Sequence, residues 1–174
     1  MPSWLATNPV GLNRQSLEHA AKTAIASLLA IFVSRLLHLG EFYWAAISTM
    51  VVLQSTLGAS LSISVLRLIG DAVGALTGAV LALYFGPNIY IFAAGVFLLG
   101  LLTAVAHLDR SAFRFAGIAL AVVMLIVHTE SPWLVAWYRF SEIAVGIFIG
   151  LLTVLVWPER PVAPAPTIGK SRAG

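Results

Sequence analysis

Two arginines, each followed by a carboxylate, stand inside stretches of sequence that are otherwise apolar. Asp71 follows Arg67 by four residues and Glu142 follows Arg139 by three, so each pair would share one face of a helix. The planar fork of an arginine matches a carboxylate, and a carboxyl group within a membrane helix is a frequent proton carrier. The pairs therefore predict a site where the arginines bind an organic anion and the acids carry protons. The alternative is that each acid is a static partner for its arginine.

The two segments that contain these pairs repeat one another. RLIGDAVGALTG at 67–78 and RFSEIAVGIFIG at 139–150 share their arginine, an alanine, a valine and two glycines, always 72 residues apart. The glycines recur every four residues, a spacing that lets helix backbones approach closely. They are Gly70, Gly74 and Gly78 in the first segment and Gly146 and Gly150 in the second. We expect the two glycine stripes to pack against each other, although tight packing without a functional role would use the same residues.

The composition shows what must surround such segments. Hydrophobic residues make up 60% of the 174 residues and charged residues only 10%, with a mean hydropathy of +0.96. A soluble domain needs about a quarter of its residues charged, so the lipid bilayer is the expected surrounding. The isoelectric point near 9.7 reflects basic residues scattered among apolar runs, which is a topology signal and not a nucleic-acid site. The absence of cysteine from the sequence excludes disulfide and thiol chemistry.

Apolar runs long enough to cross a bilayer recur along the chain. They predict an all-α integral membrane protein with six transmembrane helices, at about residues 17–39, 42–57, 62–85, 89–108, 112–128 and 131–157. Gly86-Pro87 closes the third run, Ser131-Pro132 marks a helix start, and Pro158 cannot continue the sixth helix. The runs are continuous and too long for strands. Residues 1–16 are expected to form an N-terminal cytoplasmic segment, and the proline-rich residues 158–174 a flexible tail.

The distribution of lysine and arginine predicts the orientation of the six helices. Only Arg35 and Arg139 would lie on the side opposite the termini, and the other eight basic residues would lie on the terminal side. This bias places both termini in the cytoplasm. The offset of 72 residues also maps a first unit, about residues 17–86, onto a second, about residues 89–158. Three crossings per unit would turn the second copy over, which gives a 3+3 inverted-topology repeat; chance matches in an apolar chain are the alternative.

The second predicted helix carries a polar stripe that could line a pathway. Trp44, Ser48, Val51 and Ser55 fall on one helical face, and Gln54 lies beside them. A pathway-lining role would use these side chains to contact the substrate. The same hydroxyl groups could instead hydrogen-bond between helices or to carbonyls of their own helix.

Arg35 is the remaining charged candidate. It lies near the outer end of the first predicted helix, where it could attract an organic anion or extend toward the membrane interface. The four histidines show no metal-binding spacing, and the sequence has no nucleophile–base constellation or phosphate loop. We therefore expect no enzymatic activity, no metal and no other cofactor.

A run across the second and third predicted helices resembles a known membrane domain. The sequence YWAAISTMVVLQSTLGASLSISVLRLIGDAVGAL is similar to the signature of the fusaric acid resistance-like, or aromatic acid exporter, family. The matching residues are Trp44, Ala45, Gln54, Arg67, Gly70, Asp71 and Gly74. The end of the sixth helix also resembles the family, through Trp157, Pro158 and Arg160. The likeness covers about residues 15–160.

The resemblance implies six helices and efflux of aromatic or other organic acids across the bacterial inner membrane. Plant aluminium-activated malate channels are distantly similar, and there a dimer forms the anion pathway. Exporters of the family usually pair two such modules with a cytosolic region, whereas this sequence holds one module, which favours a homodimer or a partner membrane subunit. The expected function is a transporter or efflux module, possibly proton-coupled. The alternatives are a dimeric anion channel and a non-transporting subunit of a larger efflux complex.

Overall fold

A computed structural model describes residues 14–54, 57–126 and 129–158. These residues form six helices: α1 (Arg14–Leu36), α2 (Tyr43–Leu53), α3 (Leu57–Phe85), α4 (Ile89–Val105), α5 (Arg110–Leu125) and α6 (Pro132–Val156). No strand occurs in the described part of the chain. The prediction of an all-α protein with six helices is therefore confirmed, with helix ends within a few residues of those expected. Most of residues 1–16, most of the tail and Ser55 lie outside the described residues.

The six helices differ in length. Three contain segments long and apolar enough to cross a membrane, at Ser16–Leu36, Ser60–Phe85 and Pro132–Val156. The apolar helices α2 and α4 are shorter, with 11 and 17 residues. A helix of 11 residues extends only about 16 Å, roughly half the thickness of the hydrocarbon core. The chain is thus a multi-pass membrane protein built from full-length and shorter helices.

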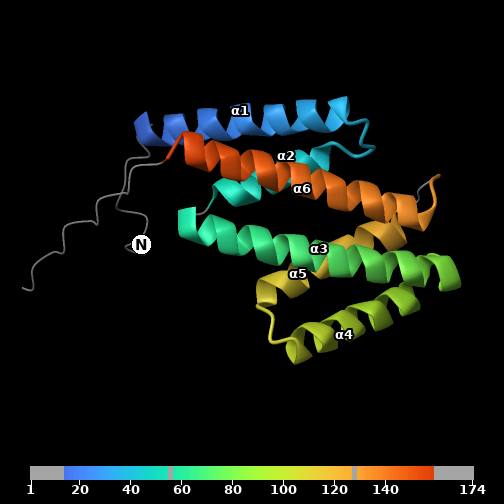
Figure 1. The fold of residues 1–174 in the computed structure, drawn as a ribbon. Coiled ribbons are helices and arrows are strands. Elements are labelled where there is room, and N and C mark those ends of the chain that lie inside the picture. Colours follow the sequence, from blue (N-terminus) through green and yellow to red (C-terminus); the bar gives the residue numbers. More distant parts are fainter. Residues whose placement is uncertain (1–13, 55–56, 127–128, 159–174) are drawn as a thin grey trace, which may run out of the picture.

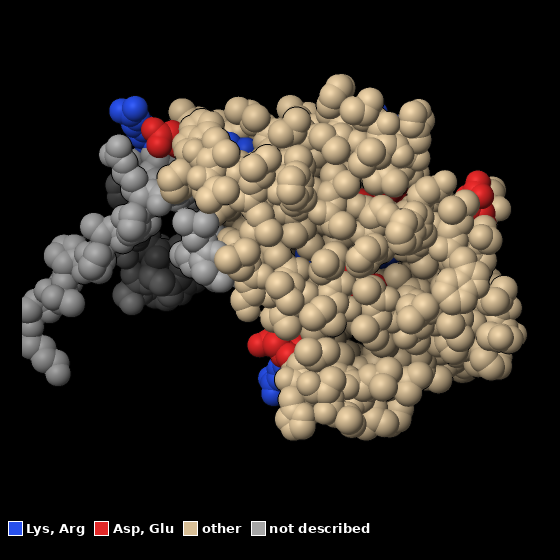
Figure 2. Space-filling view, viewed as in Figure 1, with Lys and Arg blue, Asp and Glu red and all other residues tan. Residues whose placement is uncertain are grey.

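The surface of the molecule is largely apolar. In Figure 2 the visible face is almost entirely tan, and the blue and red of charged residues gather mainly at its two ends. Large apolar side chains are widely exposed, among them Phe32 at 65%, Phe97 at 75% and Leu155 at 72%. Exposed apolar area on this scale needs lipid or protein to cover it.

Short polar signals start several of the helices. The Asn88 side chain accepts hydrogen bonds from the backbone N–H groups of Tyr90 and Ile91, at 2.8 and 3.4 Å. Asp109 accepts from the backbone N–H of Ser111 at 2.8 Å, and this donor holds the pKa of the Asp109 carboxyl below its usual value. Both residues are N-caps, which satisfy amides that a helix start leaves open.

The last predicted helix begins and ends where the sequence indicates. Ser131 is the N-cap residue of α6 and Pro132 stands at its start, although the serine side chain makes no capping hydrogen bond. Trp157 is the C-cap residue, directly before Pro158. The ammonium group of Lys22 on α1 donates to the Trp157 carbonyl at 2.7 Å, and this contact joins the first helix to the end of the last. A cation at this position also complements the negative end of the helix dipole.

Helices α1 and α4 end in the same backbone motif. His38 and His107 have φ values of 55° and 52°, in the left-handed region. The N–H of Leu39 donates to the Ser34 carbonyl, and the N–H of Leu108 donates to the Thr103 carbonyl, both at 3.0 Å. A second bond runs in each case from the histidine N–H to the carbonyl three residues earlier. This is the Schellman arrangement, in which glycine is the usual left-handed residue.

The helices lie side by side with α1 and α4 at the two edges of the molecule (Figure 1). Between them lie α6 and α3, with α2 behind α6 and α5 behind α3 in this view. Helix α1 starts, and helix α6 ends, at the same side of the molecule. One apolar cluster joins α3, α5 and α6 through Ala75, Ala79, Ala119, Val123, Val135 and Ala136. Such small side chains allow short distances between helix axes.

The glycine stripes pack α3 on α5 and α6 on α2. A Cβ atom at Gly74 would collide with the backbone of Ala116 on α5, and one at Gly146 would collide with the carbonyl of Ala45 on α2. One helical turn further on, Gly78 faces Val123 and Gly150 faces Val52, while Gly70 faces Ala112 one turn earlier on α3. Helices α3 and α6 do pack together, as the simplest arrangement of the stripes requires. The expectation that the glycines form this contact is wrong, because they face α5 and α2.

Candidate functional site

Four charged side chains are buried in the middle of the helix bundle, and we call them the buried charge cluster. They are Arg67 and Asp71 of α3 and Arg139 and Glu142 of α6, and none is more than 5% exposed. Charged side chains are rarely buried to this degree. Within a membrane domain they are costly and usually mark a pathway or a binding site. The structure thus brings together both arginines and both acids that the sequence singles out.

The central contact of the cluster is an ion pair between two helices. Nε of Arg139 on α6 lies 3.2 Å from Oδ1 of Asp71 on α3, and both side chains are 2% exposed. The sequence predicts pairing within each helix, Arg67 with Asp71 and Arg139 with Glu142. The structure instead pairs Asp71 across to the other helix, because α3 and α6 are in contact at this depth.

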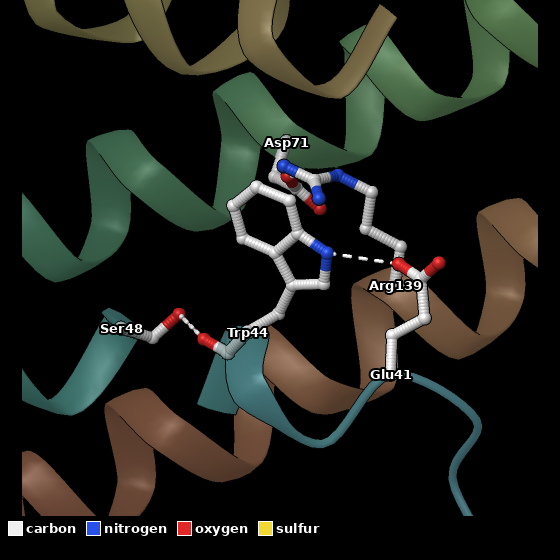
Figure 3. Close-up of polar contacts among 5 residues, drawn as sticks. All are labelled: Glu41, Trp44, Ser48, Asp71 and Arg139. Atoms are coloured by element: carbon white, nitrogen blue, oxygen red, sulfur yellow. Dashed lines mark hydrogen bonds and ion pairs between the residues drawn. The ribbon is translucent and has the colours of Figure 1, made fainter. Parts of the chain in front are cut away.

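Trp44 on α2 completes the surroundings of Arg139. The guanidinium carbon lies 3.9 Å from the centre of the Trp44 ring, and Figure 3 shows this group close to both the indole and Asp71. The indole Nε1 donates a hydrogen bond to Glu41 Oε2 at 2.9 Å, which fixes the ring. A cation over an aromatic face is stabilised by roughly 2 kcal/mol when water is excluded. Arg139 is therefore held by both an arene and a carboxylate.

Glu142 has a different role from the one that its spacing suggests. Its Oε1 atom accepts a hydrogen bond from the backbone N–H of Glu41, in the segment that leads into α2. Its Oε2 atom has no hydrogen-bond partner within the described residues. The side chain thus connects α6 to the start of α2 instead of forming an ion pair with Arg139.

Arg67 is the second buried arginine, and its surroundings differ. Its guanidinium carbon lies 4.9 Å from the centre of the Phe115 ring on α5. Its side chain makes no ion pair with any residue that the structure describes, and its Nε has no hydrogen-bond partner there. Phe115 is a contact that the sequence reasoning missed. The repeat could have indicated it, since Phe115 follows Trp44 by 71 residues.

Some of the other predicted site residues lie next to the cluster, and others are exposed away from it. Ser48 is buried next to the site, where its hydroxyl donates to the Trp44 carbonyl at 2.8 Å. Gln54 is exposed at the end of α2. Arg35 is exposed as well, and its guanidinium carbon lies 4.2 Å from the Phe42 ring centre. Trp44 of the predicted stripe thus lies against the cluster, whereas Arg35 lies away from it.

Several polar atoms in the cluster are buried without a hydrogen-bond partner in the described residues. They are Arg67 Nε, Asp71 Oδ2, Arg139 Nε and Nη1, and Glu142 Oε2. Arg139 Nε lies within ion-pair distance of Asp71 but makes no hydrogen bond with it. A buried polar atom without a hydrogen bond costs about 1–3 kcal/mol, and native proteins contain few. The set includes both donors and acceptors. The arrangement is therefore chemically able to bind an anion at an arginine and a proton at an acid.

Comparison with known proteins places these residues in a family. Residues 29–153, which include the whole cluster, match the family described as fusaric acid resistance protein-like. The chain is 30% identical over 156 residues to the uncharacterized transporter YdhK of Escherichia coli (strain K12), covering 84% of this chain and 23% of that protein. It is 29% identical over 150 residues to YdhK of Salmonella typhimurium, covering 81% and 22%. The chain thus spans less than a quarter of the length of these relatives, and no solved structure matches it significantly. As its resemblance predicted, the chain belongs to the fusaric acid resistance protein-like family.

Proposed function

We propose that this chain is a transport module of the bacterial inner membrane that moves aromatic or other organic acid anions. The observation that carries the proposal is Arg139, buried close to both the face of Trp44 and the carboxylate of Asp71. The bacterial relatives named as transporters support the same class of function. Their bacterial origin also supports the inner membrane as the location.

The contacts of Arg139 suggest how an anion would bind. The indole covers one face of the guanidinium group, so the N–H groups at its edge are the donors that remain for a carboxylate. Asp71 occupies part of that edge, whereas Nη1 has no partner in the described residues. A substrate carboxylate would therefore compete with Asp71 for the same arginine. Displaced from its counter-charge while still buried, Asp71 would take up a proton, which links anion binding to proton movement.

The recurrence of contacts supports a 3+3 inverted repeat. Arg67 lies over Phe115 as Arg139 lies over Trp44, and Gly74 meets Ala116 as Gly146 meets Ala45. The equivalent partners on α2 and α5 are 71 residues apart, and the equivalent residues of α3 and α6 are 72 apart. The proposal includes cytoplasmic termini, from the lysine and arginine distribution, and a homodimer or partner membrane subunit, from the family resemblance.

Flux through proteoliposomes tests the proposal. The purified chain is reconstituted, and uptake of labelled benzoate is measured with and without a proton gradient, for wild type and for Arg139→Gln. We expect accumulation that depends on the gradient and is lost in R139Q. Benzoate flux that is the same with and without the proton gradient would indicate a channel. No benzoate flux from the purified chain would indicate a subunit that needs partners.

Asp71→Asn tests the role of the acid separately. The amide keeps the size of the side chain but cannot carry a proton, so we expect D71N to lose gradient-driven accumulation while benzoate still binds. Counterflow at equal pH on both sides serves as the control, because it needs no net proton movement. If D71N accumulates benzoate as wild type does, Asp71 is not the proton carrier.

A further inference from the structure

Of the two buried arginines, only one forms an ion pair with a buried acid within the described residues. Each guanidinium group faces an aromatic ring of a neighbouring helix, Arg139 at Trp44 and Arg67 at Phe115. Asp71 lies one helical turn after Arg67 and forms its ion pair with Arg139. The residue 72 positions after Asp71 is Ile143, so the second repeat has no equivalent acid at that position. While Asp71 pairs with one arginine, it leaves the other without a carboxylate.

In this structure the arginine without a carboxylate is Arg67. Its side chain is 5% exposed and has no ion pair within the described residues. Isolated charges are expensive to bury, and the usual compensation is an opposite charge with hydrogen bonds. Phe115 offsets part of this cost but contributes no hydrogen-bond acceptor for Nε. Arg67 therefore lacks a direct counter-charge among the described residues.

We propose that Arg67 and Phe115 form a second binding site, which takes a carboxylate of an organic acid. The inference rests on the proposed transport function and extends it from one binding site to two. Asp71 decides which arginine accepts the ligand, because it is within reach of Arg67 on its own helix, at spacing i, i+4, and pairs with Arg139 on α6. An anion bound at Arg67 would compensate the cation that Asp71 leaves unpaired. Movement of Asp71 to Arg67 would release the anion there and free Arg139.

The local packing fixes the class of ligand. The Phe115 ring centre lies 4.9 Å from the guanidinium carbon of Arg67 and offers no acceptor, so the unpartnered Nε is left for an acceptor from the ligand. A carboxylate matches the edge of a guanidinium group with two parallel hydrogen bonds. Gly70, one residue before Asp71, keeps α3 close to α5, since a Cβ atom there would meet the Ala112 carbonyl and the Phe115 Cβ. This contact holds the ring beside the arginine.

Equilibrium binding of labelled benzoate to the purified full chain in detergent tests the second site. We expect one benzoate per chain for wild type and two for D71N, in which Asp71 no longer competes with the ligand for either arginine. Arg67→Gln should bind at least ten times more weakly than wild type, because Asp71 still occupies Arg139. R139Q should also bind benzoate more weakly than wild type does, because Asp71 can then pair with Arg67. The double variant D71N/R139Q should again bind one benzoate tightly, at Arg67. Arg114→Gln, an exposed neighbour bonded to Ser111, is the matched control and should bind as wild type does.

The unfolding temperature provides a second test. It distinguishes a ligand-binding role of Arg67 from a purely structural one. Without benzoate, R67Q should unfold at a higher temperature than wild type, because an uncompensated buried charge is removed. Added benzoate should raise the unfolding temperature of wild type and leave that of R67Q nearly unchanged. A lower unfolding temperature for R67Q without benzoate would overturn the second site.

The outcomes separate this inference from the proposed function. If R67Q binds as tightly as wild type and D71N still binds one benzoate, the second site is wrong, although flux that depends on Arg139 would leave the transport function standing. A wild type that neither binds nor transports benzoate would contradict both.

Discussion

Arg139 makes contacts with two neighbouring helices through one guanidinium group. It forms an ion pair with Asp71 on α3 and lies over Trp44 on α2, while it belongs to α6 itself. Both charges of the pair are removed from solvent, so each depends on the other for compensation. Removal of one partner from such a pair is far more damaging than removal of both.

Arg139→Gln should therefore destabilise the protein by about 3–5 kcal/mol, since it breaks the buried ion pair that joins α6 to α3. The free energy of unfolding in detergent, measured with a denaturant series, checks the value. The double variant D71N/R139Q is the control and should lose less than R139Q alone. Equal losses in the single and double variants would show that the ion pair does not couple α3 to α6.

The two left-handed histidines offer a test of backbone strain at single positions. A residue with a side chain costs roughly 1–2 kcal/mol in this region, and glycine avoids this cost but adds entropy to the unfolded chain. His38→Gly should therefore stabilise the protein by roughly 0.5–1 kcal/mol. The unfolding free energy checks it, with His38→Ala as the matched variant that keeps a Cβ atom. A glycine variant no more stable than the alanine variant would contradict the strain at His38.

At the scale of whole helices, close approach between backbones sets the architecture. Gly74 and Gly146 each occupy a place where a Cβ atom would collide with backbone atoms of the facing helix. Backbone cannot move aside as a flexible side chain can. The α3–α5 and α2–α6 pairs are thus fixed by glycine, whereas the α3–α6 contact uses alanine, valine and the ion pair.

Gly74→Ala should force α3 away from α5 and destabilise the protein by about 1–3 kcal/mol. Gly117→Ala is the matched control, because no atom lies within 4 Å of the position that its Cβ would take. That substitution should be neutral or stabilise by roughly 0.5–1 kcal/mol, since alanine favours a helix more than glycine does. The free energies of unfolding of both variants test whether Gly74 is needed for the close approach of α3 to α5. Similar values for the two would mean that Gly74 is not needed for close packing.

The helices could be predicted from the sequence, but their partners could not. Proline and capping residues mark helix ends locally, which is why α6 begins at Pro132 as expected. Helix α2 ends at Leu53, earlier than predicted, where the sequence turns polar at Gln54. The glycine spacing indicates close approach without indicating which helix approaches. The same limit applies to the site. Spacing along one helix predicts an ion pair between Arg67 and Asp71, whereas the observed ion pair between Asp71 and Arg139 depends on how α3 packs against α6.

At the scale of the molecule, the bundle presents an apolar surface around a charged interior. The charges on the visible face gather mainly at the two ends (Figure 2), and the cluster lies between helices that the sequence separates widely. Composition alone predicts the membrane surrounding, since it follows from totals and not from contacts. The orientation in the membrane follows from the lysine and arginine distribution and can be tested without removing any native thiol, because the sequence has no cysteine.

Single cysteines test the orientation. In intact cells, a membrane-impermeant maleimide should label Pro87→Cys, between α3 and α4, and should not label Ser111→Cys at the start of α5. Both should react once the membrane is permeabilised, which controls for accessibility of the thiol. The reverse pattern in intact cells would place the termini outside the cytoplasm.

The glycine contacts also determine which parts of the bundle can move independently. Helices held backbone to backbone shift as one body, so α3 travels with α5 and α6 travels with α2. Sliding between these two bodies is then concentrated where α3 meets α6, and the ion pair of Arg139 with Asp71 crosses that boundary. If the chain transports as proposed, a rearrangement that opens the interior to one side of the bilayer would separate this ion pair, and an anion that replaces Asp71 on the arginine would act as the trigger for the shear.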